Sequence, residues 1–203
     1  ADILDFCLND PAWQVSVAAA AYAGERGRDH LIKLLQKAPG EGRIAAVKAL
    51  AEFKDRVCRT ALKNHFLHTN SHDLKLEILK TFRKNGDASL NDFLLDLISH
   101  PDTGIVVSAV KALGSCGMLS SVKHLHSLMN SPQQFPRVKA VAKKAIAEIH
   151  ARLAQGNEAG RLSVSEREAR QGSLSIAQNT KPNVASTGTR NPQKSKRRKI
   201  PEI

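Results

Sequence analysis

The stretch Ile105-Val-Val-Ser-Ala-Val-Lys-Ala-Leu-Gly114 decides the fold of this chain. Its apolar residues recur at intervals of three and four, which is the spacing of one face of an α-helix. After Gly117, a second apolar pattern of the same kind follows as Leu119-Ser-Ser-Val-Lys-His-Leu-His-Ser-Leu-Met129. Two amphipathic helices joined by glycines predict a helix pair that reverses direction at the glycines.

The same helix pair occurs four times. One copy lies 31 residues earlier, and two more precede it. An apolar residue late in each first helix marks the period, with gaps of 27, 32, 31 and 33, at Ala23, Leu50, Phe82, Leu113 and Ile146. A last helix of the first type, over residues 138–153, closes the series. A period of about 20–50 residues indicates a repeat protein whose pairs bury their apolar faces by stacking. The sequence therefore predicts an all-α fold, a right-handed α-α superhelix.

Glycines are expected where the helices of a pair reverse, because glycine adopts left-handed backbone conformations at little cost. These positions are Gly24, Gly27, Gly86, Gly114 and Gly117.

The repeat pattern resembles the HEAT-like repeats of phycobilin lyase subunits and of many bacterial scaffold proteins. The resemblance covers residues 10–153, and the matching positions are Val15, Ala19, Ala20, Gly24, Ile105, Ala109, Ala112, Leu113 and Gly114. A basic position of the family pattern is kept as Arg43, Lys75 and Lys139, but Ser16 and Val106 replace it elsewhere. The resemblance implies a HEAT-like solenoid. A lyase subunit of this type would also need a second subunit and a bilin-bearing partner.

We expect three regions along the chain. Residues 1–9 read as the end of a truncated upstream repeat, and residues 10–154 as the HEAT-like repeat domain. No aromatic residue follows Phe135, and Ser, Asn, Gln, Thr and Gly dominate the last quarter. This composition predicts a disordered tail over residues 155–203.

Composition and charge narrow the class of protein and the cellular compartment that the sequence fits. Of the formal net charge of +12, more than half lies after residue 150, where 11 Lys and Arg face 4 Asp and Glu. Cys7, Cys58 and Cys116 are isolated from one another, which favours a reducing compartment over a disulfide framework. No apolar run approaches the roughly 18–20 residues that span a bilayer. We therefore expect a cytoplasmic protein, or a nuclear one if the basic tail is a localisation signal.

No catalytic constellation stands out. His65, His68 and His72 form the best metal candidate, but no carboxylate or cysteine completes a ligand set, so solvent-facing or capping histidines are expected. There is no His-Glu dipeptide of the kind that HEAT-fold hydroxylases use for iron. We expect no metal, no cofactor and no intrinsic catalysis.

A binding surface is the more credible functional feature. The second helices carry basic residues at Lys33, Lys37, Arg56, Arg59, Lys63 and Lys123. The third repeat adds Asp92 and Asp96, and this mixed charge favours a protein partner over nucleic acid. The tail carries a second basic cluster that is expected to contact nucleic acid or an anionic membrane surface, at Lys194, Lys196, Arg197, Arg198 and Lys199.

Taken together, the sequence predicts a protein-binding scaffold or adaptor module without catalysis. Two alternatives stay open. One is a subunit of a bilin lyase-type complex, and the other is the cytosolic HEAT-like arm of a larger membrane protein.

Overall fold

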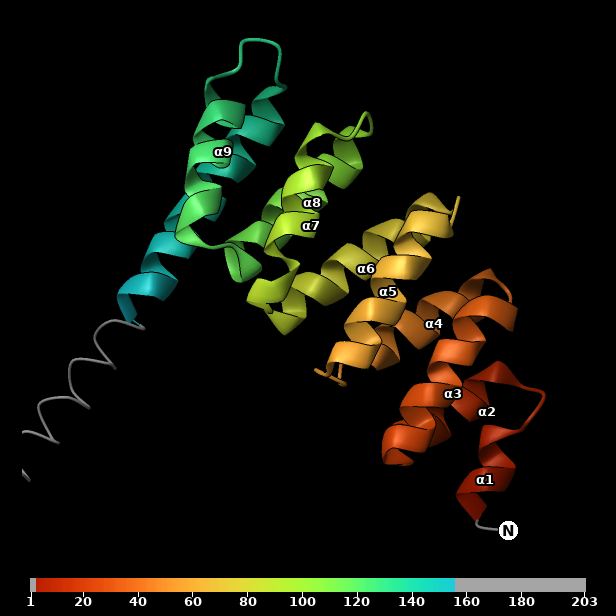
Figure 1. The fold of residues 1–203 in the computed structure, drawn as a ribbon. Helices are drawn as coiled ribbons and strands as arrows, with labels where there is room; N and C mark the ends of the chain where they lie inside the picture. Colours follow the sequence, from red (N-terminus) through yellow and green to blue (C-terminus); the bar gives the residue numbers. More distant parts are fainter. Residues whose placement is uncertain (1–2, 156–203) are drawn as a thin grey trace, which may run out of the picture. The chain divides into compact units, whose positions relative to one another are not determined.

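The computed structural model describes residues 3–155, which are largely α-helical and contain no strand (Figure 1). Contacts divide the chain into two units, Ala1–Asn157 and Glu158–Ile203, and every described residue belongs to the first unit. The predicted tail beyond residue 155, with its basic cluster, lies outside the described residues. None of the helices within residues 3–155 is long and apolar enough to cross a membrane.

Two sets of helices alternate along the chain. The first helices are α2 (Trp13–Ala20), α4 (Gly40–Leu50), α6 (His72–Asn85), α8 (Thr103–Cys116) and a helix over residues 136–155. The second helices are α3 (Gly24–Lys37), α5 (Arg56–His68), α7 (Asn91–Asp96) and α9 (Leu119–Asn130). A short helix, α1 (Ile3–Leu8), precedes them and packs on α2.

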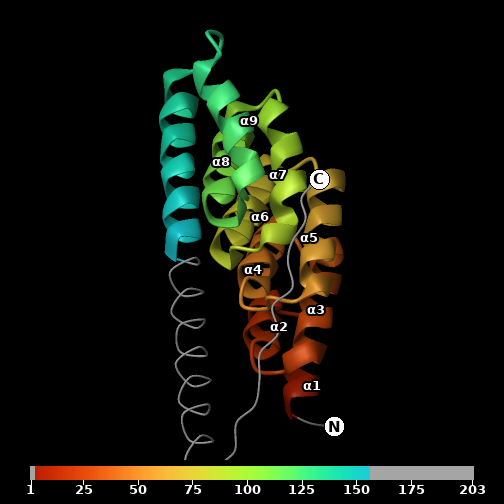
Figure 2. The ribbon, with the colours of Figure 1, turned by 60° about the vertical axis from the view of Figure 1, so that its left-hand side comes forward.

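Each set forms one layer (Figures 1 and 2). In the layer of first helices, α2 contacts α4, α4 contacts α6 and α6 contacts α8. In the layer of second helices, α3 contacts α5 and α7 contacts α9. The buried apolar side chains between the layers form one continuous core through the repeats. This arrangement confirms the predicted all-α solenoid.

Repeated ion pairs tie successive second helices together. The Arg28 guanidinium donates to Asp55 at 3.1 Å, and the Arg59 guanidinium lies 2.5 Å from Asp87. Both acceptors also cap the next helical segment. Asp55 accepts a hydrogen bond from the backbone N–H of Cys58 at 2.7 Å, and Asp87 accepts one from the N–H of Ser89 at 2.8 Å. Because the pairs lie about one repeat apart, the same contact is used at two successive junctions.

An uncharged contact serves the third junction. The side-chain oxygen of Asn91 accepts hydrogen bonds from the backbone N–H of Met118, at 3.1 Å, and from the hydroxyl of Ser121. Asn91 and Ser121 are both buried, so each satisfies the other's polar group away from water.

The structure corrects the role of two glycines. Gly24 and Gly86 have φ angles of 55° and 62° and lie at reversals, as predicted. Gly27, however, lies inside α3, where a β-carbon would overlap the backbone carbonyl of Ala20. Gly114 likewise lies inside α8, where a β-carbon would overlap the carboxylate of a neighbouring glutamate. Both of these glycines permit close helix packing instead of a reversal.

The second helix of the third repeat is shorter than its apolar pattern suggested. Only six residues, Asn91–Asp96, are α-helical, and 3-10 turns over Ala88–Leu90 and Leu97–Ser99 flank them. His100 is extended, with a ψ angle of 141°, and precedes Pro101. A proline disfavours the helical conformation of the residue before it, which explains why the last 3-10 turn ends at Ser99.

Candidate functional site

A groove between α3 and α5 combines histidines with apolar walls. Its volume is about 400 Å³, and it is lined by Ile32, Leu35 and Gln36 of α3 and by Ala61, Asn64, His65 and His68 of α5. On each helix these residues follow the i, i+3, i+4 spacing of one helix face, which each helix presents to the groove. Two helices about one repeat apart in sequence therefore build the site together.

His65 is the most perturbed side chain of this groove. Its Nε2 atom is buried and has no hydrogen-bond partner within the described part of the chain. Burial lowers the pKa of His65 below its ordinary value of 6.5, and the charges of Arg43 and His68 lower it further. His65 is therefore neutral at pH 7. A neutral imidazole can donate one hydrogen bond and accept another, which suits it to bind a polar ligand or to exchange a proton.

The six basic residues of the predicted binding surface do not line this groove. Four of them are exposed, at Lys33, Lys37, Arg56 and Lys123. The other two make contacts within the protein, since Arg59 pairs with Asp87 and the Lys63 ammonium lies 5.1 Å from the centre of the Phe93 ring. The predicted partner-binding role of the six residues stays a prediction.

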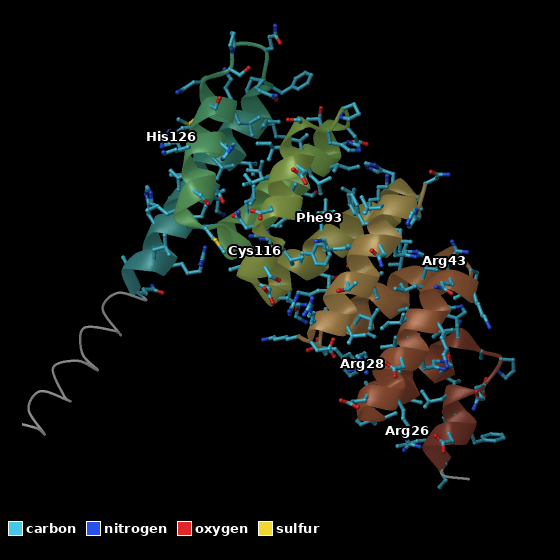
Figure 3. The ribbon with its side chains drawn as sticks, in the orientation of Figure 1. Arg26, Arg28, Arg43, Phe93, Cys116 and His126 are labelled. Carbon is cyan, nitrogen blue, oxygen red and sulfur yellow. The ribbon has the colours of Figure 1, made fainter. Side chains whose placement is uncertain are left out.

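Phe93 of α7 joins the second and third repeats. Its ring, labelled in Figure 3, packs edge-on against Phe66 of α5, with ring centres 5.5 Å apart, and against Phe82 of α6 at 6.0 Å. Lys63 completes the contact from α5. Asp92 and Asp96 of the same helix are exposed.

The three histidines of the candidate metal site, His65, His68 and His72, lie in two different places. His65 and His68 line the groove, whereas His72 lies at the start of α6 with its Nδ1 atom 2.9 Å from a carboxylate oxygen of Asp102. Within residues 3–155 no group of three or more potential ligands is arranged to hold a metal ion. The expectation was that these histidines face solvent or cap a helix. His68 is exposed, whereas His65 is half-buried and its Nε2 atom is buried, a difference that a single-helix pattern contains no information on.

No protein-family model matches the sequence, and no curated protein matches it at the sequence level. Solved structures do match. A chain of the complex of CpcE and CpcF of phycocyanin lyase from Nostoc sp. PCC7120 matches with a TM-score of 0.54 and 18% identity. The match covers 72% of this chain and 63% of that chain, so the present chain spans less than two thirds of the lyase chain. An engineered protein matches with a TM-score of 0.47 and 18% identity, over 73% and 78% of the two chains.

The comparison corrects the expectation that this chain lacks catalytic activity. That expectation came from the missing catalytic motifs along single helices. The matched chain belongs to a phycocyanin lyase complex, so a fold of this kind occurs in an enzyme complex and the missing motifs do not exclude catalysis. The groove residues come from two helices that are separated in sequence by a reversal and a first helix, so motifs along a single helix do not reveal such a grouping.

The fold is the part of the prediction that the solved structures confirm. The helical-repeat part of the scaffold prediction is confirmed, and the predicted protein partner is coarsely compatible with a fold that occurs in a two-protein complex. This chain has a HEAT-like helical-repeat fold similar to that of a phycocyanin lyase chain.

Proposed function

We propose that this chain is a subunit of a bilin lyase-type complex and that it binds a bilin in the groove between α3 and α5. The observation that carries the proposal is the likeness of its fold to a chain of the CpcE–CpcF phycocyanin lyase complex. The bilin lyase alternative is therefore favoured over a scaffold function that has no support beyond the repeat architecture.

The chemistry of the groove suits a bilin. A bilin is an open chain of four pyrrole rings, so it presents flat apolar surfaces, ring nitrogens and carboxylate groups. Ile32 and Leu35 offer apolar walls, and His65 offers a neutral hydrogen-bonding group. The volume of about 400 Å³ falls in the usual range for small-molecule sites, about 300–1,000 Å³.

Basic side chains on α3 complete the proposed recognition. Lys33 and Lys37 are exposed and lie one position along the helix from Ile32 and Gln36, which line the groove. A lysine side chain is long and flexible, so its ammonium group can reach the carboxylates of a ligand that extends beyond the groove. We propose that these two lysines bind the bilin carboxylates, while the partner protein docks on the second-helix layer.

A titration with a free phycobilin tests the groove. We expect the full chain to induce circular dichroism in the visible absorption of the bilin, since an asymmetric site fixes one twist of a flexible chromophore. Asn64→Trp places a large ring in the groove from an exposed position and should weaken binding by about tenfold or more. Thr60→Trp adds the same ring to an exposed position of α5 outside the groove and is the matched control.

Two results would contradict this site. One is the absence of any visible signal at saturating bilin. The other is equal affinity of the Asn64→Trp and Thr60→Trp variants, which would place the ligand elsewhere.

Purification from native cells tests the partner. A second protein that stays bound to the chain after truncation at Gln155 would support a complex formed through the repeats. Recovery of nucleic acid or lipid alone, lost on truncation, would contradict it.

We further propose a cytoplasmic location, because the three cysteines are free thiols in the structure.

A further inference from the structure

A lysine recurs at the same place in four successive first helices. It lies two positions before the apolar residue that marks the period of the repeats, at Lys48, Lys80, Lys111 and Lys144. All four lysines are exposed, and their gaps of 32, 31 and 33 residues equal those of the apolar markers. We call this row of four lysines the basic ridge. Because the repeats stack, equivalent positions of successive first helices face the same side of the layer.

An ion pair shows that the first two ridge lysines are neighbours. Glu52 follows the end of α4 and Lys84 lies near the end of α6, with the carboxylate and the ammonium 2.6 Å apart. Lys48 precedes Glu52 by four residues, and Lys80 precedes Lys84 by four residues. Four residues are about one helical turn, so Lys48 and Lys80 lie one turn from this pair, on the same sides of α4 and α6.

The other two ridge lysines share a cleft. The cleft has a volume of about 170 Å³ and lies between α6, α8 and the helix over residues 136–155. It is lined by Arg83, Lys111, Val141, Lys144, Ala145 and Glu148. Three of these residues are basic and one is acidic. Arg83 and Lys111 form no ion pair with any residue of the described part of the chain, so their charges are available to a ligand.

The acidic residues of the first helices do not cancel the ridge. Glu77 pairs with Lys80 at 2.9 Å, but the Glu77 side chain is 15% exposed and that of Lys80 is 68% exposed. Lys144, which lies 3.9 Å from Glu148, is likewise the more exposed partner. Over α4, α6, α8 and the helix at 136–155, eight Lys and Arg residues are exposed, against two Asp and Glu residues. The outer surface of these helices is therefore positive.

Another periodic set of basic residues serves the fold, in contrast to the ridge. Arg43 is half-buried and donates to the backbone carbonyl of Ala38 at 2.8 Å. Lys75 is also half-buried, and its ammonium lies 5.5 Å from the centre of the Phe66 ring. Within residues 3–155 the side chains of Lys48 and Lys111 make no such contact. Internal stabilisation therefore does not explain why a lysine recurs at the ridge positions.

We propose that the basic ridge binds the phosphate backbone of double-stranded DNA without reading its sequence. A DNA duplex carries one negative charge per about 1.7 Å of its axis, so a line of cations along it meets phosphates throughout. Packed helix axes are about 8–10 Å apart, so four ridge lysines extend over about 24–30 Å, which is the length of about eight base pairs. A lysine ammonium is a compact charge on a flexible stem, which suits contacts that need no fixed geometry.

The other side chains of these helices favour this partner over a protein, a membrane or a single strand. No large apolar side chain is exposed on α4, α6, α8 or the helix over residues 136–155. Protein interfaces use apolar or aromatic anchors, membrane-bound helices insert apolar side chains, and single strands stack on aromatic rings. Exposed Ser, Thr, Asn and Gln side chains, which could read bases or the 2′-hydroxyl groups of RNA, are absent from α4, α6 and α8.

DNA binding by the ridge goes beyond the proposed bilin site and does not rest on it. The ridge belongs to the first helices, whereas every residue that lines the bilin groove belongs to α3 or α5 of the other layer (Figure 2). The mixed charge that favours a protein partner is also a property of the second helices. A chain that lacks the ridge lysines should therefore bind a free phycobilin as well as the original chain does.

Fluorescence anisotropy of a labelled duplex of about 24 base pairs, titrated with the full chain at several salt concentrations between about 50 and 200 mM, is the deciding experiment. The ridge variant combines Lys48→Gln, Lys80→Gln, Lys111→Gln and Lys144→Gln. The matched control removes the same charge from exposed positions of the second helices, by Lys33→Gln, Lys37→Gln, Arg56→Gln and Lys123→Gln. The basic cluster of the tail is intact in both variants, so its contribution to binding is the same. Far-ultraviolet circular dichroism confirms that both variants remain folded.

We expect the ridge variant to bind the duplex about tenfold or more weakly at the lower salt concentrations. The slope of the logarithm of the affinity against the logarithm of the salt concentration should become shallower by about three to four, because four phosphate contacts are lost. The control variant should lose less than about threefold in affinity and keep the slope of the original chain.

Three outcomes would overturn the proposal. The first is a chain that does not bind the duplex at about 50 mM salt, including one that binds only vesicles of anionic phospholipid. The second is an equal loss for the ridge variant and the control variant, which would show that net charge alone attracts the DNA. The third is a ridge variant that binds like the original chain, which would assign the binding to another part of the chain.

Discussion

Asp55 uses its two carboxylate oxygens for different contacts. Its Oδ1 atom caps α5 by accepting from Cys58, and its Oδ2 atom accepts from Arg28 of the preceding repeat. The cap fixes the start of a helix, and the ion pair fixes the position of that helix against its neighbour. Partial burial raises the pKa of Asp55, but the backbone hydrogen bond from Cys58 and then the hydrogen bond from Arg28 outweigh it and hold this pKa below its ordinary value of 3.8.

Replacing Asp55 separates these two contacts. Asp55→Ala removes both and should lower the free energy of unfolding by about 1–2 kcal/mol, mostly through the lost cap. Asp55→Asn keeps a good capping residue and should cost less. Urea unfolding measures both. Glu25→Ala is the control, because Glu25 is 88% exposed and 3.9 Å from Arg28, so no change is expected. Equal losses for Ala and Asn would show that the charge dominates.

Two partly buried histidines make stability depend on pH. Burial lowers the pKa of His30 and of His65 below 6.5 in the folded chain, with Lys33 adding to the effect at His30. Protons therefore bind more tightly to the unfolded chain. The stability contribution is complete above pH 6.5 and decreases as the pH falls below it. Below about pH 4, Asp55, Asp87 and Asp102 add to this loss, because the pKa of each is also lowered in the folded chain.

A series of urea midpoints between pH 8 and pH 3 checks this dependence. We expect a flat region above about pH 7, a first decline below 6.5 and a second below about 4. His65→Gln should reduce the first decline, and Asp87→Asn should reduce the second. A midpoint that rises on acidification would contradict the direction of all these shifts.

At the scale of helices, the sequence predicted the first helices well. Their alanine and leucine stripes are long and periodic, so α4, α6 and α8 lie where the pattern placed them. It failed where a feature depends on a neighbouring repeat. The inward position of Gly27 depends on the approach of α2, and the groove around His65 depends on how α3 meets α5. The periodicity of a single helix contains no information on how closely a neighbouring helix approaches.

Two glycine substitutions test whether close helix packing is the reason that position 27 needs a glycine. Gly27→Ala should destabilise the chain by more than about 2 kcal/mol, because the new methyl group would overlap the Ala20 carbonyl. Gly40→Ala adds the same methyl group at the start of α4, where nothing lies within 4 Å, and should be neutral or stabilising. Thermal unfolding distinguishes them. A tolerated Gly27→Ala would mean that α2 and α3 can separate without cost.

At the scale of the molecule, the core protects two of the three cysteines. Burial raises the pKa of Cys58 to about 12 and that of Cys116 to about 11, so both stay protonated and unreactive at neutral pH. Cys116 also donates to the backbone carbonyl of Phe82, at 3.2 Å (Figure 3). The native chain in dilute solution should therefore react with one equivalent of a thiol reagent, and the denatured chain with three. Three reactive thiols under native conditions would contradict this core.

The junctions between second helices differ in the physical nature of their contacts. Arg28–Asp55 and Arg59–Asp87 are charge pairs near the surface, while Asn91 and Ser121 form a neutral buried contact. Dissolved ions screen the first kind over about 8 Å at physiological ionic strength and leave the second unchanged. Concentrated salt should therefore loosen the solenoid from the α3 and α5 side first, so that amide hydrogen exchange begins there while α9 stays protected.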